Sequence, residues 1–363
     1  MSNVTEAHIL EALRQVHEPQ KGQDIVALDL VKNLKISGST VNFTLVLNRT
    51  VASFKQQMQA AAEQAVKAVP GVETVDITIE RPVAPDPRLL SRADLQVRNA
   101  IAIASGKGGV GKSTMSTNIA LSLALDGAKV GLLDVDVYGP NIPIMMGVHE
   151  QPKGSNNKIQ PLQGHGIKMM SMGFLVDPEQ PIIWRGPMLH NAIRQFIEDV
   201  DWGDIDYLII DLPPGTGDAS LSLSQSLGLT GAVIVTTPQQ VAISDVIRSV
   251  GMFKQLNVPI LGVIENMSYF VAPDTGKRYD IFGHGGGAAM AKKVGVDFLG
   301  EVPLEPEVRI GGDEGQPIVV RDPDSAAAKA IRDVAQRVAS AVEKRNLGQA
   351  GSKFGDPVLS IIK

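Results

Sequence analysis

The sequence predicts an α/β fold with a mostly parallel sheet flanked by helices, preceded by a small α+β domain. Two observations lead to this prediction. From Asn99 onward, short aliphatic runs alternate with helical stretches, and these runs lack the period-two alternation of half-exposed strands. Such runs are typical of parallel strands that are buried on both faces. Before residue 80, apolar and polar residues alternate in two segments, which indicates β-strands of a separate domain.

Residues 1–80 are expected to form the small α+β domain. Apolar residues at helical spacing predict a first helix, which Thr5 can cap. The remaining elements are predicted strands at 25–31 and 41–47, a helix from Phe54 to Val69, and a strand at 75–79. The order of elements in this domain is therefore α-β-β-α-β.

The rest of the chain divides into three segments. Residues 81–98 hold prolines beside charged residues, which predicts a semi-rigid linker. Residues 99–345 are predicted to form the parallel α/β domain, and residues 346–363 a loose tail. The expected strands of the α/β domain are 100–104, 129–133, 206–211, 231–236 and 259–264, with helices beginning near residues 112, 187, 241 and 325.

Composition excludes several functional classes. The chain has 363 residues, of which 44% are hydrophobic, so a sizeable core is expected rather than disorder. A net charge of −5 and an aromatic content of 4% give no sign of a nucleic-acid surface. No run approaches the ~20 apolar residues of a membrane span, and no signal peptide is visible, so we expect a cytoplasmic protein without a membrane partner. The absence of cysteine excludes thiol nucleophiles and thiolate metal ligands.

A glycine-rich loop follows the predicted strand at 100–104 and precedes a predicted helix. Consecutive glycines let backbone N–H groups surround phosphate oxygens, and the helix N-terminus adds a partial positive charge. Lys112 is expected to reach the β- and γ-phosphates, and Ser113 to ligate Mg²⁺. The sequence therefore predicts an ATP and Mg²⁺ site of the P-loop NTPase type. The loop residues are Gly106, Lys107, Gly108, Gly109, Val110, Gly111, Lys112, Ser113 and Thr114.

Lys107 is a second lysine that a basic phosphate-binding loop does not require. It suits a dimer in which each subunit's lysine reaches the nucleotide of the other, as an arginine finger does. It is equally consistent with a solvated loop lysine. The loop residues by themselves leave both interpretations open.

Acidic side chains end two of the predicted strands. Asp134 and Asp136 follow one aliphatic run, and Asp211 ends another. We expect Asp211 to hold Mg²⁺ through water, and Asp136 to orient the attacking water because it lies further toward the loop. Asp134 is expected to support the phosphate-binding region. Gly215, after two prolines, can direct its N–H at the γ-phosphate.

Several segments together closely resemble the Mrp/ApbC family. These proteins are deviant Walker A ATPases, related to the Min and Par partition ATPases and to the nitrogenase iron protein. The N-terminal region is similar to the small domain that precedes many of them. The segments that carry the resemblance are residues 106–114, 132–140, 184–187, 211–218, 236–239 and 265–269.

The resemblance implies a homodimer that encloses two ATP molecules and hydrolyses them slowly. Lys107 is then the catalytic lysine that acts in trans, beside Lys112 and Asp136. Asn266 is implied to read the adenine, and the segment around Pro303 to pack on its ring. The family's role is to bind iron–sulfur clusters and transfer them, which implies iron–sulfur apoproteins or assembly factors as partners.

The sequence departs from the family where the cluster ligands are expected. The family places a Cys-x-x-Cys pair just after the Glu-Asn-Met-Ser-Tyr segment, and these positions are Ala272 and Thr275 here. Iron–sulfur clusters are held mainly by thiolates, so a cluster bridged in the usual way is not expected. Asp274, Tyr279 and His284 offer weaker ligands nearby, although we expect a surface loop there.

Two further functions are consistent with this departure. The chain can be a nucleotide-gated interaction protein that opens or closes a partner surface without any cluster. It can also resemble the partition ATPases that position cargo on DNA or membranes, which the acidic net charge of −5 disfavours.

Overall fold

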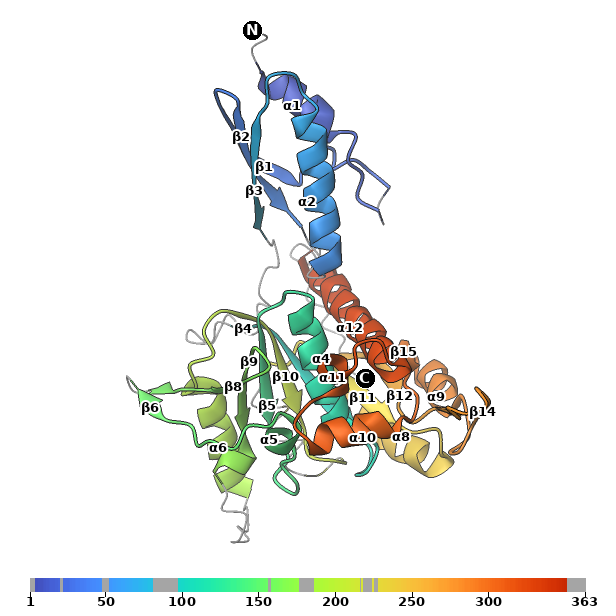
Figure 1. The fold of residues 1–363 in the computed structure, drawn as a ribbon. Helices are drawn as coiled ribbons and strands as arrows, with labels where there is room; N and C mark the ends of the chain where they lie inside the picture. The colour runs from blue at the N-terminus through green and yellow to red at the C-terminus, as the bar shows by residue number, and fades with distance from the viewer. Residues whose placement is uncertain are drawn as a thin grey trace, which may run out of the picture. The chain divides into compact units, whose positions relative to one another are not determined.

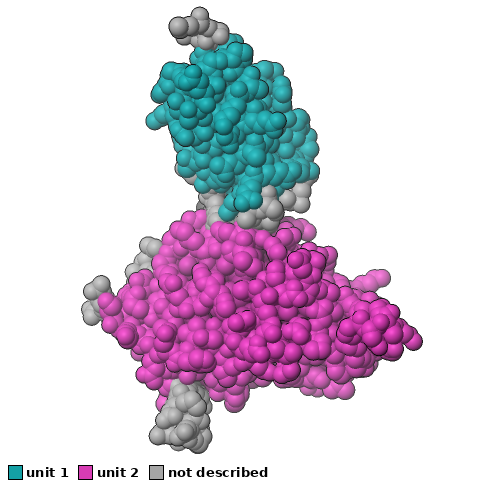
Figure 2. Space-filling model, in the orientation of Figure 1, with its two compact units in different colours: residues 1–83 teal, residues 84–363 magenta. Residues whose placement is uncertain are grey.

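The computed structural model describes residues 4–19, 22–47, 52–80, 97–155, 158–175, 186–215, 217, 224 and 228–350. The chain forms two compact units, residues 1–83 and 84–363, which Figure 2 shows in different colours. Each unit has its own buried apolar core.

The first unit packs two helices on a three-stranded sheet (Figure 1). The sheet order is β1-β2-β3, with β1 antiparallel and β3 parallel to β2. Thr5 caps the first helix, because its Oγ1 accepts a hydrogen bond from the His8 N–H at 3.4 Å. The elements are α1 (Glu6–Leu13), β1 (Val31–Ser37), β2 (Thr40–Val46), α2 (Ala52–Lys67) and β3 (Thr74–Glu80).

The strand predicted at 25–31 is wrong. These residues form successive turns that begin at Asp24, whose Oδ1 accepts hydrogen bonds from the N–H groups of Val26 and Ala27. Asp29 has a left-handed φ of 57°, which a strand does not allow. Ile25 and Leu30 are nonetheless buried, so the apolar character reflects packing into the core and not an extended backbone.

The second unit is built on an eight-stranded sheet in the order β15-β12-β11-β4-β10-β5-β9-β8. Every neighbouring pair is parallel except β8 and β9, and helices flank the sheet (Figure 1). This confirms the predicted fold class. The strands are β4 (Val97–Ser105), β5 (Val130–Asp134), β8 (Leu162–Gly164), β9 (Ile167–Ser171), β10 (Ile205–Asp211), β11 (Gly231–Thr236), β12 (Ile260–Glu265) and β15 (Phe298–Glu301).

The five strands expected in this domain are all present, and the sheet is wider than predicted. Two short hairpins lie outside it: β6 (Gly154–Ser155) with β7 (Lys158–Ile159), and β13 (Phe270–Val271) with β14 (Arg278–Tyr279). The helices are α4 (Lys112–Leu125), α5 (Ile142–Met145), η1 (Met172–Phe174), α6 (Gly186–Glu198), α8 (Gln240–Gln255), α9 (Gly286–Val294), α10 (Pro306–Asp313), α11 (Ile318–Arg321) and α12 (Ala326–Ala350). Within the described residues, no helix has the length and apolar character needed to cross a membrane.

The carboxyl ends of the central strands place the candidate site. β4 lies between β10 and β11, and β10 lies between β4 and β5. In this register Asp211 pairs with Asp134 on β5 and with Ile103 on β4. The loop that leaves β4 therefore lies beside the acidic ends of two neighbouring strands, where open α/β sheets bind their ligands.

Candidate functional site

The loop between β4 and α4 adopts a conformation that depends on its glycines. Gly109 and Gly111 have left-handed φ values of 80° and 82°, and Gly111 is the N-cap residue of α4. A Cβ added to Gly111 would collide with the side-chain amide of Asn266, and one added to Gly106 would collide with the backbone of Asp245. At these two positions the loop therefore approaches its neighbours too closely for any residue with a Cβ.

A buried lysine and a buried carboxylate lie at the centre of the site. The Lys112 Nζ donates to Asp211 Oδ2 at 2.8 Å and lies 3.3 Å from Asp136 Oδ2. Asp211 also accepts hydrogen bonds from the hydroxyls of Ser113 and Ser116, each at 2.6 Å. Burial alone would lower the pKa of Lys112, but the charges of Asp211 and Asp136 outweigh it, so the pKa of Lys112 is raised and the ammonium stays charged.

The two aspartates that follow β5 are also withdrawn from water. Asp134 accepts hydrogen bonds from the Asp136 N–H at 3.0 Å and from the Ser171 hydroxyl at 2.8 Å. Burial, followed by the nearby charge of Asp211, raises the pKa of Asp134 to about 8. Burial also raises the pKa of Asp136, against the opposing charge of Lys112. Asp134 thus holds the backbone of the segment that presents Asp136.

Two adjoining cavities open beside the loop. One has a volume of about 190 Å³ and is lined by Lys107, Lys112, Ser113, Asp136 and the loop glycines. The other has a volume of about 340 Å³ and is lined by Asn266, Met267, Pro303 and Leu304, among others. Gly111, Thr114, Asn141 and Met145 line both. A small cavity with lysine, serine and aspartate residues in its lining, next to a larger one, suits a ligand with a phosphate chain and a flat ring.

The structure brings most of the predicted site residues to these two cavities. Lys107 is half-buried, and among the described residues its ammonium has no hydrogen-bonding or ionic partner. The Asn266 amide donates to the Val110 carbonyl at 2.9 Å, so it braces the loop as well as lining the larger cavity. The Gly215 N–H, expected to face the γ-phosphate, donates here to the Ser105 carbonyl at 2.9 Å. Residues 184–185, 216 and 218 of the matching segments lie outside the described residues.

Sequence reasoning missed Ser116 and Ser171. Ser116 lies one helical turn after Lys112, so a polar residue at that spacing on a buried helix was a usable signal. Ser171 ends β9, a strand that was not predicted.

The positions of the expected cysteines lie in the β13–β14 hairpin. Ala272 is half-buried and Thr275 is exposed. The hairpin closes through a hydrogen bond from the Ala272 N–H to the Lys277 carbonyl at 2.9 Å. Neither side chain offers a thiolate.

Known proteins are similar to this chain in sequence and in fold. A family model described as NUBPL iron-transfer P-loop NTPase matches residues 96–339. The chain belongs to this family. A second model, described as iron-sulfur cluster assembly protein, matches residues 6–79. The resemblance to iron–sulfur carrier ATPases is thereby confirmed.

Individual relatives agree with this assignment. An iron-sulfur cluster carrier protein of Synechocystis is 50% identical over 343 residues, which cover 92% of this chain and 97% of the relative. One of Deinococcus radiodurans is 45% identical over 357 residues, which cover 97% and 99%. A solved nucleotide-binding protein of Archaeoglobus fulgidus, in complex with ADP, is 37% identical with a TM-score of 0.58, covering 66% of this chain and 94% of its own. The cell division ATPase MinD of Pyrococcus furiosus, at 23% identity and a TM-score of 0.51, shares the fold over 67% of this chain and 98% of its own.

Proposed function

We propose that this protein is a dimeric ATPase of the iron–sulfur carrier lineage that hydrolyses ATP slowly. We also propose that it does not bind a cluster through the family's usual thiolates. The observation that carries the nucleotide part is the buried Lys112–Asp211 pair beside the cavity of about 190 Å³. A lysine is stable in such a position only if anionic groups surround it, and a phosphate chain can replace the carboxylates in that role.

The loop residues fit Mg²⁺ and ATP. Backbone N–H groups from Gly106 to Thr114 surround the phosphates, and Lys112 turns from Asp136 to the β- and γ-phosphates. The Ser113 hydroxyl, which donates to Asp211 at 2.6 Å, would ligate Mg²⁺ in this proposal, and Asp211 would hold the ion directly or through water. Bound Mg²⁺ neutralises charge on the phosphates. Asp136 orients the attacking water, while Asn266 and Pro303 position the base in the larger cavity.

Replacement of Lys112 by alanine tests the site. We expect ATP binding and turnover to be lost, with the far-ultraviolet circular dichroism of the chain retained. Lys129→Ala is the matched control, because its side chain is 67% exposed and remote from the cavities. A folded Lys112→Ala chain that still binds and hydrolyses ATP would refute the assignment.

Lys107 is proposed to act across the dimer. Lys107 lines the smaller cavity, and its ammonium has no partner among the described residues, so we infer that it is available to a second subunit's nucleotide. Mixing a Lys107→Ala chain with a Lys112→Ala chain tests this proposal. Each variant is inactive alone, and the mixed dimer regains activity if the lysine works in trans. A lack of complementation, with dimers verified by light scattering, would contradict it.

The proposed cargo is where this chain departs from what the names of its relatives suggest. Relatives at 45–50% identity are named iron-sulfur cluster carrier proteins, which favours iron–sulfur apoproteins or assembly factors as partners. The absence of cysteine favours a second candidate function, in which ATP opens or closes a partner surface and no cluster is carried. Anaerobic cluster reconstitution on the natural chain and on an Ala272→Cys/Thr275→Cys variant separates the two. A stable cluster on the natural chain would support cluster carriage; a cluster on the variant alone would support the gating function.

A further inference from the structure

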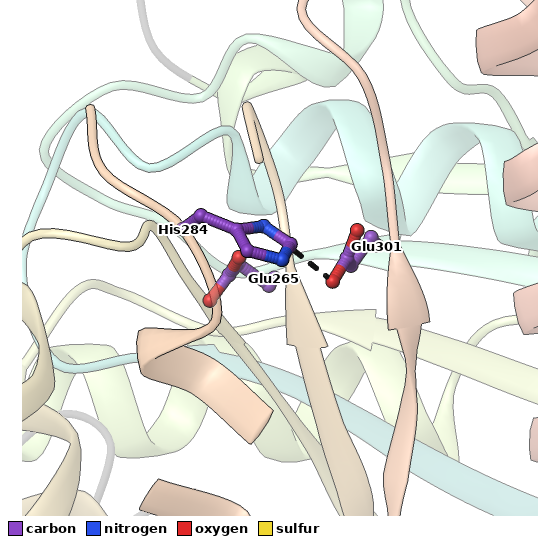
Figure 3. A group of neighbouring side chains, drawn as sticks. All are labelled: Glu265, His284 and Glu301. Carbon is purple, nitrogen blue, oxygen red and sulfur yellow. Dashed lines mark ion pairs between the residues drawn. The ribbon is translucent and has the colours of Figure 1, made fainter. Parts of the chain in front are cut away.

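Three ligand-type side chains meet outside the nucleotide cavities (Figure 3). Glu265 ends β12, Glu301 ends β15, and His284 lies just before α9. One ligand atom from each lies within 4.8 Å of the other two, and His284 Nδ1 is 3.8 Å from Glu301 Oε1. Glu265 is fully buried, whereas the side chains of His284 and Glu301 are 46% and 27% exposed. The group therefore has a buried anchor and an open side.

The carboxylate of Glu265 is fixed in position with one lone pair left over. Its Oε1 accepts hydrogen bonds from the Ser268 hydroxyl at 2.7 Å and from the Gly285 N–H at 3.2 Å. Its Oε2 accepts a hydrogen bond from the Gly287 N–H. A carboxylate has about four lone-pair sites, so Oε2 retains one. Hydrogen bonds of this kind orient metal ligands in known sites.

A cation already lies against the cluster. The Arg278 Nη2 is 2.8 Å from His284 Nδ1 and 3.7 Å from Glu301 Oε2. Because a guanidinium can only donate, Nδ1 must be the unprotonated nitrogen, which is the form that binds metals. Arg278 also pairs with Asp280 at 3.0 Å and lies over the Tyr269 ring, so it keeps other partners if it moves away.

We propose that Glu265, His284 and Glu301 bind a first-row divalent transition-metal ion, and that this ion displaces Arg278. One imidazole nitrogen and two carboxylate oxygens suit Zn²⁺, Co²⁺ or Fe²⁺, whereas Mg²⁺ prefers oxygen alone. The exposed side leaves room for water ligands. Of the weak ligands expected near the hairpin, His284 takes part, whereas Asp274 is not in this group. The site does not depend on the proposed ATPase activity.

Cobalt titration of the full-length, chelator-treated chain tests the proposal. Excess Mg²⁺ is present to fill the nucleotide site, and equilibrium dialysis with visible absorption reports bound Co²⁺. We expect one Co²⁺ per chain, and an affinity at least about 10-fold weaker in His284→Ala and in Glu301→Gln, since even supporting groups of metal sites have effects of that size. His149→Ala is the matched control and should bind as the natural chain does, because His149 is exposed and outside the cluster.

Arg278→Ala provides the sharper comparison. Removing the competing guanidinium should tighten Co²⁺ binding, an outcome that a purely structural role for His284 does not predict. ATP affinity, measured on each variant, reports that the unit is folded. Equal Co²⁺ affinity in the natural chain and His284→Ala, or weaker binding in Arg278→Ala, would overturn the proposal.

Discussion

Removal of the Lys112 side chain is expected to destabilise the second unit even without nucleotide. The Lys112 side chain is 6% exposed and that of its partner Asp211 is 0% exposed. Alanine at position 112 leaves Asp211 with two serine donors and no counter-charge. Breaking a buried ion pair by removing one partner typically costs about 3–5 kcal/mol, far more than a surface pair. We therefore expect the free energy of unfolding to fall by about that amount.

Urea unfolding followed by tryptophan fluorescence measures this loss. The sequence has two tryptophans, Trp184 and Trp202, and both belong to the second unit. Lys129→Ala is again the control: its ion pair with Asp204, at 3.5 Å, is exposed and should contribute less than about 1 kcal/mol. If Lys112→Ala proved no more destabilising than Lys129→Ala, Lys112 would not be the counter-ion that keeps Asp211 buried.

Three further variants probe the same site. Asp136→Asn should slow single-turnover hydrolysis by about 10²–10⁴-fold with ATP affinity retained; an equal loss of affinity would show that the carboxylate shapes binding instead. Gly111→Ala should abolish binding of a fluorescent ATP analogue, because an added Cβ meets the Asn266 amide and φ is 82°; normal affinity would contradict this. Burial raises the pKa of Asp134 from 3.8 to about 8, so the folded state binds this proton more tightly than the unfolded state does. The free energy of unfolding should therefore fall as the pH rises from about 4 to about 8. Asp134→Asn, whose amide can still accept from Asp136 and donate to Ser171, should flatten this dependence, and an unchanged slope in urea unfolding would assign it to other groups.

The central strands could be predicted because their aliphatic residues indicate burial. β4, β10 and β11 contain short aliphatic runs that are buried on both faces, and their length and β-branched residues favour a strand over a buried helix. The prediction of a strand at 25–31 was wrong because apolar residues in successive turns can also be buried in the core. Edge strands such as β8 and β15 are short and contain glycine or a charged residue, so their own sequence does not indicate a strand. They form because they pair with a neighbouring strand.

Part of the candidate site could likewise be predicted from the sequence, and part could not. Lys112 and Asp211 are far apart in sequence, but a parallel sheet brings the carboxyl ends of its strands together, so their meeting could be expected. The Glu265–His284–Glu301 group could not be expected. It needs β15, which was not predicted, and a turn before α9 that returns His284 to the end of β12.

The arrangement of elements explains how the proposed nucleotide site can accompany the absence of the expected cluster ligands. The buried side chains proposed for that site come from α4, from β10 and from the segment after β5, and they contact one another. The positions of the expected cysteines lie in the β13–β14 hairpin, which forms a two-stranded sheet separate from the central one. Among the described residues, no hydrogen bond joins Ala272 or Thr275 to the loop at 106–114, so we expect a change at these two positions to leave nucleotide binding intact. The proposed metal site and the proposed nucleotide site meet at neighbouring residues. Glu265 belongs to the metal site, and the next residue, Asn266, braces the loop by its hydrogen bond to Val110.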